Sequence, residues 1–368
     1  MALPKESPKK PGQVLGFAAY RWFEFSPAFE FRRRFATNQN SSTRLVDFFG
    51  KAGSDRIHLL YAVLLTAIMD QNPIITSPDV AAALAAAKPV VALESTVIAH
   101  GLPRPQNIET AARLEQIVHA EGATPATIAV INGRFCVGLD RAQLDQIATG
   151  QDIKKLSVRD LAIARARKWD GATTVASTIW VAHRAGIQVF ATGGIGGVHR
   201  GSLPDVSADL TELARTPMIV VCSGAKIVLD LPATREWLET NSVTVVGYGC
   251  DEMPAFYSRR SELPVDVRCD SPEDVVRIFK TEADLDLRSA LLVTIPVPTA
   301  DEVDSSLLQD VLDESLVEAE RKKIVGRDLT PFLLARMSET SKGATLRANI
   351  ALLQNNVLVA AQIAMALI

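Results

Sequence analysis

The sequence has few cysteines, and they lie far apart. They are Cys136, Cys222, Cys250 and Cys269, and no two of them have the short spacing of a zinc site or of a dithiol redox pair. Cys222 lies within an apolar run, which predicts a small buried core residue. The spacing argues against a cysteine-bound metal, and it indicates a reducing compartment, for which we expect the cytoplasm.

The sequence also lacks a strong charge of one sign and a long hydrophobic run. Its net charge is −3 over 368 residues, whereas nucleic-acid-binding proteins usually carry a basic patch. The longest apolar run near the start, residues 59–69, is too short to cross a bilayer. We therefore expect no nucleic-acid partner and no membrane association. Hydrophobic residues make up 48% of the chain, which is ample for a sizeable core.

Residues 1–74 differ from the rest of the chain. Residues 4–11 are rich in lysine and proline, which is typical of disorder, and the only short helix expected here covers residues 57–69. An Arg-rich leader that contains serine is also typical of a mitochondrial transit peptide, so a mitochondrial location stays open as the alternative, although several acidic residues argue against it. We predict a largely disordered extension over residues 1–74 and one folded domain over residues 75–368.

Strand and helix patterns alternate from residue 77 onward. Ser77 and Pro78 mark a helix start, since serine caps the first N–H groups and proline fits the first turn. Buried strands are predicted over residues 89–93, 126–131, 173–176, 187–191, 218–222, 243–248 and 291–295, and helices over residues 107–121, 158–169, 178–185, 271–281, 300–320, 331–339 and 345–367. Such alternation predicts an α/β fold, with a mainly parallel sheet and helices on both faces.

A glycine-rich turn follows the strand predicted at residues 187–191. Residues 193–201 contain five glycines, which are unlikely as packing material and which let a ligand approach the backbone closely. N–H groups at such a turn, or at a helix start, suit an anion such as phosphate. The alternative is a plain strand-to-helix turn, because the run matches neither a P-loop nor a dinucleotide fold.

Polar side chains follow several of the predicted strands. Ligands of an open α/β sheet bind beyond the carboxyl ends of its strands. Glu94 directly follows one strand, Thr192 follows a second, and Lys226 follows a third, while Lys155 precedes a helix. Each has a structural alternative, because Glu94 could cap a helix together with Ser95 and either lysine could be exposed surface charge.

The surroundings of these residues favour a catalytic or ligand-binding role. The small residues 223–225 would partly desolvate the Lys226 amine and favour its neutral, nucleophilic form. Asp205 and Asp209 lie four residues apart, which on a helix places both carboxylates on one face. They could bind a hard divalent cation or merely favour a helix start. A lone histidine is more often structural, but His199 stands beside the glycines.

Seven short motifs are spread over residues 77–364. They are Val90–Thr96, Pro105–Asn107, Gly171–Thr178, Phe190–Gly201, Ser207–Leu210, Pro254–Tyr257 and Thr330–Leu334. Together they resemble the motifs of the pseudouridine-5'-phosphate glycosidase family, also called the indigoidine synthase A-like family.

The resemblance implies an α/β enzyme that assembles as a homotrimer and uses a divalent metal, typically Mn²⁺. Its implied reaction is the reversible cleavage of the C–C glycosidic bond of pseudouridine 5'-phosphate to uracil and ribose 5-phosphate. By the resemblance, Glu94 matches the proton donor, Lys226 the nucleophile and Asp205 the metal ligand. The positions that match substrate-binding residues are Lys155, Val175, Ser207, Ala208 and Asp209, and those that match further active-site residues are His199 and Asn349.

The implied chemistry agrees with the residues at hand. A C–C glycosidic bond has no leaving oxygen or nitrogen to protonate, and an imine between ring-opened ribose and Lys226 supplies an electron sink. Glu94 would then move protons between sugar and base, and the glycine turn and Lys155 would hold the 5'-phosphate. Two alternatives stay open: an enzyme that joins ribose 5-phosphate to another base, and an inactive phosphosugar-binding protein.

The chain departs from the family pattern in three places. Residues 1–70 have no counterpart, and the loop at residues 202–204, just before Asp205, is slightly short. Ile295-Pro296 stands where the family usually has Asn-Pro. We therefore expect an altered base or sugar preference.

Overall fold

The structure is a computed structural model, and it describes residues 73–200, 205–324 and 326–368. The predicted extension up to residue 72, with its helix at residues 57–69, and the loop at residues 202–204 lie outside the described residues. The first described strand covers Ile74–Thr76. Pro73 is already bonded to the sheet, because its carbonyl oxygen accepts from the N–H of Phe135 at 2.8 Å.

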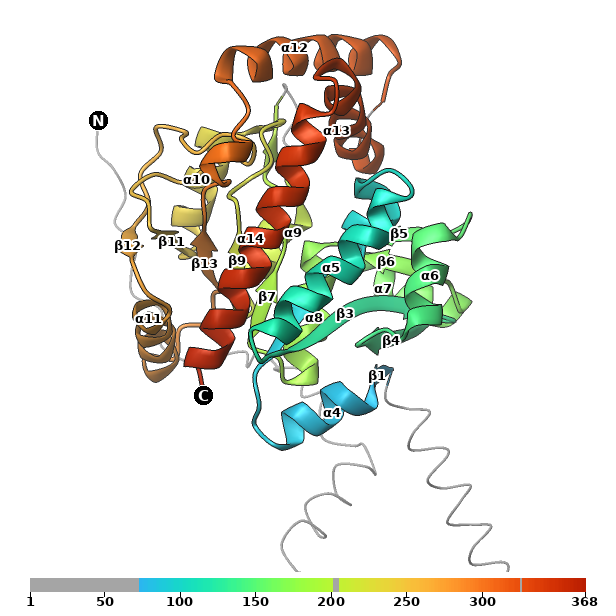
Figure 1. The fold of residues 1–368 in the computed structure, drawn as a ribbon, viewed down its shortest axis with the longest axis vertical. Coiled ribbons are helices and arrows are strands. Elements are labelled where there is room, and N and C mark those ends of the chain that lie inside the picture. Colours follow the sequence, from blue (N-terminus) through green and yellow to red (C-terminus); the bar gives the residue numbers. More distant parts are fainter. Residues whose placement is uncertain (1–72, 201–204, 325) are drawn as a thin grey trace, which may run out of the picture. The chain divides into compact units, whose positions relative to one another are not determined.

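A mainly parallel sheet forms the centre of the fold (Figure 1). Its strands are β1 (Ile74–Thr76), β2 (Val90–Leu93), β3 (Thr124–Ile131), β4 (Arg134–Val137), β5 (Lys154–Leu156), β6 (Gly171–Thr173), β7 (Val189–Ala191), β9 (Ile219–Cys222), β11 (Thr244–Tyr248), β12 (Val267–Cys269) and β13 (Leu291–Thr294). The strand order is β1-β4-β3-β2-β7-β9-β13-β11-β12, and β5 joins through β6, which pairs with β3. Every pair from β3 to β12 in this order is parallel, whereas β4 and β6 run antiparallel to β3. The predicted α/β fold is confirmed.

Central position explains the composition of the strands. All residues of β2, β7, β9 and β13 are buried. Parallel strands covered on both faces read as continuous apolar runs rather than as alternating ones. A separate short ribbon pairs β8 (Val198–His199) with β10 (Leu229–Asp230).

Helices cover both faces of this sheet. They are α4 (Pro78–Ala85), α5 (Gln106–Ala120), α6 (Arg141–Thr149), α7 (Val158–Arg167), α8 (Val175–Ala185), α9 (Ala208–Leu213), α10 (Leu231–Thr240), α11 (Pro272–Asp284), α12 (Ser305–Arg321), α13 (Leu329–Thr340) and α14 (Ala344–Ala366), with the short helices η1 (Val97–Gly101), η2 (Thr299–Asp301) and η3 (Gly326–Asp328). In Figure 1, α5 and α14 lie side by side in front of the strands and α8 lies behind them.

Local signals place most helix starts correctly. The hydroxyl of Ser77 accepts from the N–H of Val80 at 3.3 Å, as predicted for the cap of α4. The strand predicted at residues 173–176 is wrong beyond Thr173, because the Thr174 side chain accepts from the N–H of Ser177 and begins α8. Threonine suits a strand and also caps a helix, so the pattern alone did not separate the two.

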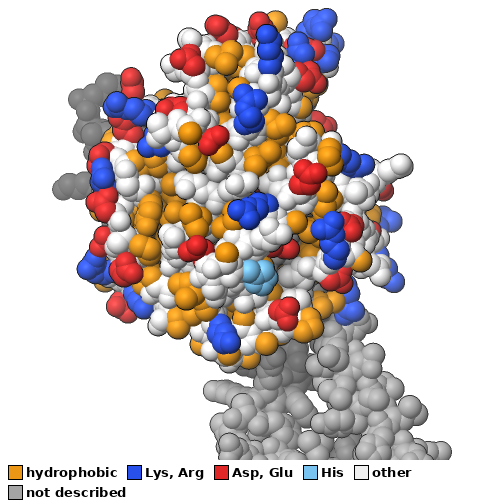
Figure 2. Space-filling model, viewed as in Figure 1, with side chains coloured by type: hydrophobic (Ala, Val, Ile, Leu, Met, Phe, Trp, Pro, Cys, Tyr) orange, Lys and Arg blue, Asp and Glu red, His pale blue; other side chains and the backbone are white. Residues whose placement is uncertain are grey.

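The last helix forms part of the core. By length and composition α14 could cross a membrane, but 61% of its apolar window is buried inside the protein. It packs against α5, β7 and β9. On the face shown in Figure 2, positive and negative side chains are interspersed among hydrophobic ones, without a large patch of one sign.

Candidate functional site

Three adjacent parallel strands end side by side at the site. β2 pairs with β7, and β7 pairs with β9, so their carboxyl ends meet at one edge of the sheet. Glu94 follows β2, Thr192 follows β7, and Lys226 lies shortly beyond β9. The structure thus brings together the three side chains that the strand pattern predicts.

The carboxyl group of Glu94 is buried, and it is bonded to a hydroxyl. Glu94 is 9% exposed, and its Oε1 accepts a hydrogen bond from Thr192 Oγ1. Burial raises the pKa of Glu94, while the Lys226 ammonium and the Thr192 bond act in the opposite direction. A carboxyl with a raised pKa keeps its proton closer to neutral pH, which suits a general acid. Glu94 does not cap a helix, so that alternative is wrong.

The Lys226 amine lies against the glycine turn. Its Nζ donates to the carbonyl oxygen of Gly194 at 2.6 Å, and its backbone N–H donates to the carbonyl oxygen of Ile195 at 3.2 Å. The side chain is half-buried. These bonds anchor the amine at the turn and leave its other N–H groups for a ligand.

Lys155 completes a compact group of charges. It lies in β5, opposite Ala172 of β6. Burial lowers the pKa of Lys155, and the neighbouring Lys226 lowers it further, whereas Asp209 and Glu94 raise it. Two amines and two carboxyl groups therefore share one partly buried site, where they can combine binding of an anionic substrate with proton transfer.

Asp205 and Asp209 do not share a helix face, and that prediction is wrong. α9 begins only after Ser207, whose hydroxyl accepts from the N–H of Asp209 at 3.3 Å. Asp205 is therefore an exposed loop residue, whereas Asp209 is 7% exposed. Asp209 Oδ1 accepts from the N–H of Ala176 at 2.9 Å, and Oδ2 from that of Gly196 at 2.8 Å. Asp209 thus ties the start of α8 to the glycine turn.

The remaining predicted substrate-binding residues lie at two helix starts. Val175 is the first residue of α8 and is buried. Ala208 is the exposed first residue of α9, and Ser207 is its cap. The two helices pack against each other, so both starts belong to the same region, and helix starts present N–H groups that suit an anion.

Close packing explains why glycine is needed at positions 194 and 196. The structure thereby corrects the expectation that these glycines are not packing positions, and also the alternative that the turn leads into a helix. A Cβ on Gly194 would lie 2.6 Å from the ring of Phe256, and one on Gly196 would lie 2.3 Å from Ser207 Oγ. The turn leads into β8 and not into a helix. Gly194 and Gly196 are therefore packing positions, and the strand-to-helix alternative is wrong as well.

Gly196→Ala should damage the site, whereas Gly193→Ala should be tolerated. A Cβ at position 196 would meet Ser207 Oγ at 2.3 Å, while one at position 193 would meet only the ends of two leucine side chains, at 3.2 and 3.3 Å. Overpacking typically costs about 1–3 kcal/mol. We expect a lower melting temperature and a loss of about tenfold in kcat/KM for Gly196→Ala alone. Equal behaviour of the two variants in melting and kinetic assays would contradict this.

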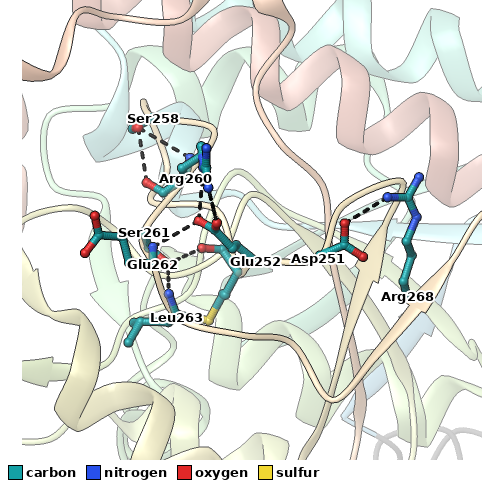
Figure 3. A network of polar contacts seen from close by, with 9 residues as sticks. Asp251, Glu252, Ser258, Arg260, Ser261, Glu262, Leu263 and Arg268 are labelled. Carbon is teal, nitrogen blue, oxygen red and sulfur yellow. Dashed lines mark hydrogen bonds and ion pairs between the residues drawn. The ribbon is translucent and has the colours of Figure 1, made fainter.

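The segment between β11 and β12 covers the glycine turn. Phe256, which has a φ of +62°, donates its N–H to the carbonyl oxygen of Ser223 at 3.0 Å. Figure 3 shows the network that holds this segment: the Glu252 carboxylate accepts from Arg260 Nη2 at 2.5 Å and from the N–H of Glu262 at 3.1 Å. Backbone strain of this kind persists only where its surroundings enforce it. Sequence reasoning missed the network because the segment has no periodicity.

One asparagine of α14, Asn356, reaches the ends of β7 and β9. The Asn356 amide donates to the carbonyl oxygen of Thr192 at 2.9 Å, and its Oδ1 accepts from Ser223 Oγ at 3.1 Å. Asn349, predicted at the site, lies on the same helix face two turns earlier and is 5% exposed. Asn349 therefore shares the helix face that Asn356 presents to the ends of β7 and β9. Polar residues within an apolar helix were the signal that could have found Asn356.

Comparison with known proteins places this site in one family. The family model described as Indigoidine synthase A like protein matches residues 79–366. The chain belongs to this family.

Relatives and solved structures of similar length support the assignment to the family. A pseudouridine-5'-phosphate glycosidase of Methylobacterium nodulans is 50% identical over 293 residues, which cover 79% of this chain and 87% of that protein. One of Geobacillus kaustophilus is 48% identical over 293 residues, which cover 79% and 97%. The prealnumycin C-glycosynthase AlnA, solved in complex with ribulose 5-phosphate, is 38% identical with a TM-score of 0.74, and the match covers 81% of this chain and 97% of AlnA. An indigoidine synthase A-like protein of Thermotoga maritima is 36% identical with a TM-score of 0.73, and the match covers 79% and 95%.

Asp205 is the donor group that would hold the metal expected from the family. Within residues 73–200, 205–324 and 326–368, no group of three or more His, Cys, Asp or Glu side chains is placed to hold an ion. Asp205 offers one exposed carboxylate, and its carbonyl oxygen accepts from the N–H of His199 at 2.8 Å. One hard oxygen ligand fits a divalent ion that takes its other ligands from water and substrate phosphate.

Ile295, at the position where the resemblance leads us to expect asparagine, follows β13. Its N–H donates to the carbonyl oxygen of Cys222 at 2.8 Å, and the residue is 4% exposed. The edge of the sheet therefore carries an apolar side chain here, next to the strand that leads to Lys226.

Proposed function

We propose that the chain is a pseudouridine-5'-phosphate glycosidase, which reversibly cleaves the C–C bond between uracil and ribose 5-phosphate. The observation that carries this proposal is the grouping of Glu94, Lys226 and Lys155 in one site, within a chain that covers most of the length of the glycosidases it matches. Lys226 is the nucleophile, Glu94 the proton donor, and Lys155 binds the anionic end of the substrate.

In the synthetic direction, the Lys226 amine attacks the aldehyde carbon of ring-opened ribose 5-phosphate. Loss of water leaves an iminium, whose positive nitrogen is the electron sink. Carbon 5 of uracil forms a bond to the iminium carbon and then loses its proton to a base, for which Glu94 is placed. The sugar 4-hydroxyl attacks the same carbon, and the C–N bond breaks, which frees the lysine and closes the ring.

Cleavage is the reverse of these steps. Glu94 protonates carbon 5 of the base as the C–C bond breaks, and the lysine nitrogen supplies the electron pair that forms the iminium. Water then hydrolyses the iminium and releases ribose 5-phosphate. The net reaction is pseudouridine 5'-phosphate plus water to uracil plus ribose 5-phosphate.

Product analysis tests this function directly. Incubation with pseudouridine 5'-phosphate should release uracil and ribose 5-phosphate in equal amounts. The 38% identity to a C-glycosynthase and the apolar Ile295 favour one second candidate, an enzyme that joins ribose 5-phosphate to another carbon nucleophile. Absence of uracil release, with C-glycoside formation from other bases, would favour that candidate. Binding of the phosphosugar without either reaction would indicate an inactive binding protein.

A divalent ion, such as Mn²⁺, held by Asp205 is also part of the proposal. When bound, the ion would supply positive charge for the substrate phosphate, while Asp205 contributes the protein oxygen. Asp205→Asn should weaken Mn²⁺ binding by about tenfold or more and leave the melting temperature of the metal-free protein unchanged. Titration calorimetry with Mn²⁺ measures this, and unchanged turnover after thorough chelation would overturn the assignment.

Residues 1–72 are proposed to be dispensable for turnover. The bond from Phe135 to Pro73 and the pairing of β1 with β4 fix where a deletion must stop. A chain that begins at Pro73 should retain kcat/KM within about twofold, because all of the proposed site residues follow Pro73 in the sequence. Loss of activity with an unchanged circular dichroism spectrum would contradict this.

A homotrimer in the cytoplasm, a reducing compartment, completes the proposal. All four cysteines are free thiols, and burial raises the pKa of Cys222 to about 12, so this thiol stays protonated and inert. Light scattering on the purified chain would report its oligomeric state.

A further inference from the structure

His100 lies close to Lys155, although no sequence motif pointed to it. It belongs to the π-helix η1, which begins shortly after Glu94. Thr96, which precedes η1, donates its hydroxyl to the carbonyl oxygen of Thr173 at 2.8 Å. π-Helical turns occur often at functional sites.

The π-helix packs against the strand that carries Lys155. Ala99 packs against a small apolar cluster that contains Ala172, and Ile153 packs against the same cluster. Ala172 is the strand partner of Lys155. His100 thus follows Glu94 in η1, and its imidazole is near enough to Lys155 for the lysine charge to act on it.

One nitrogen of His100 has no partner. Its Nε2 is buried and makes no hydrogen bond to any described residue. Burial lowers the pKa of His100, and Lys155 lowers it further, while the backbone oxygen of Ile153 and the carboxylate of Asp328 raise it. A neutral imidazole with its proton on Nδ1 presents Nε2 as an acceptor. Unsatisfied buried acceptors of this kind are rare in native proteins.

We propose that His100 is a substrate-positioning residue, whose Nε2 accepts a hydrogen bond from an N–H or O–H group of the substrate held beside Lys155. This rests on the substrate-binding role proposed above for Lys155. Lys155 donates a hydrogen bond to an oxygen of the substrate, while His100 accepts one from an N–H or O–H group of the substrate. The pair therefore recognises one acceptor and one donor of the same molecule. Sugar hydroxyls and the N–H groups of uracil are the two sources of such a donor.

His100→Asn and His100→Gln test the proposal. Asparagine places a nitrogen near Nδ1 but has no atom at Nε2, whereas the longer glutamine restores an acceptor there. We expect His100→Asn to raise KM by about tenfold or more with a smaller change in kcat, and His100→Gln to recover part of this. His119→Asn, at the exposed end of α5, is the matched control and should leave KM unchanged.

Trapping with borohydride and ribose 5-phosphate alone locates the donor. If His100→Asn needs a higher concentration of ribose 5-phosphate than the unaltered enzyme for half-maximal trapping, the donor belongs to the sugar. If only the KM for uracil changes, the donor belongs to the base. Either result supports the proposal. An unchanged KM for both substrates, with a lower melting temperature in both variants, would overturn it in favour of a structural role. Lys155→Ala is measured separately, and a normal KM there would contradict the role of Lys155 itself.

Discussion

Lys226→Ala is expected to abolish turnover of pseudouridine 5'-phosphate, with a loss of about 10³-fold or more in kcat. The reaction needs a group that forms a covalent bond to the sugar carbon and then carries positive charge, and a carboxylate cannot do this. Lys226 is held for that task by its 2.6 Å bond from Nζ to the carbonyl oxygen of Gly194. Alanine leaves the buried strand β9 intact, so the melting temperature should change little.

Lys155→Ala is the matched comparison, because Lys155 is the other amine of the site. It should raise KM and leave covalent chemistry possible. Borohydride reduction in the presence of ribose 5-phosphate, followed by peptide mass analysis, should find the sugar on Lys226 in the unaltered enzyme and in Lys155→Ala. An adduct on Lys155, or full activity of Lys226→Ala, would disprove the imine mechanism.

The convergence of Glu94, Thr192 and Lys226 was predictable because it depends on strands alone. Each residue follows a continuous apolar run, and parallel neighbouring strands place their ends together. The relation of Asp205 to Asp209 was not predictable in this way. It depends on where α9 begins, and Ser207 sets that point through a local side-chain bond.

Contacts between distant segments explain what the sequence could not supply. Gly194 packs against Phe256, whose segment lies far along the chain, so this close approach has no local signal. His100 depends on the packing of Ala99 and Ile153 against a shared cluster, and its unpaired nitrogen is visible only once those residues are in place. The role of Asn356 likewise depends on distant segments, since its partners Thr192 and Ser223 follow other elements.

Glu94→Gln is expected to lower kcat by about 10²–10⁴-fold while the fold is retained. Glutamine keeps the oxygen that accepts from Thr192 Oγ1, but it has no proton to transfer at the reacting carbon. In the unaltered enzyme, burial raises the pKa of Glu94 above its ordinary value of 4.5. The cleavage rate should therefore fall as the pH rises, and this fall should be centred above pH 4.5. In Glu94→Gln the cleavage rate should no longer show this fall. A fall that persists in the variant would show that another group donates the proton.

The Glu94 carboxyl should also make the free energy of unfolding depend on pH. Because the pKa of Glu94 is higher in the folded protein than its ordinary value of 4.5, the native state binds more protons than the unfolded chain between these two values. The free energy of unfolding must then fall as pH rises through that window, since a buried carboxylate loses solvation that the neutral acid does not need. Glutamine cannot ionise, so the melting temperature of Glu94→Gln should rise relative to the unaltered enzyme across the window and then stay above it. A difference that is constant from acid to neutral pH would show that Glu94 does not titrate with a raised pKa, and its role as the acid would fail with it.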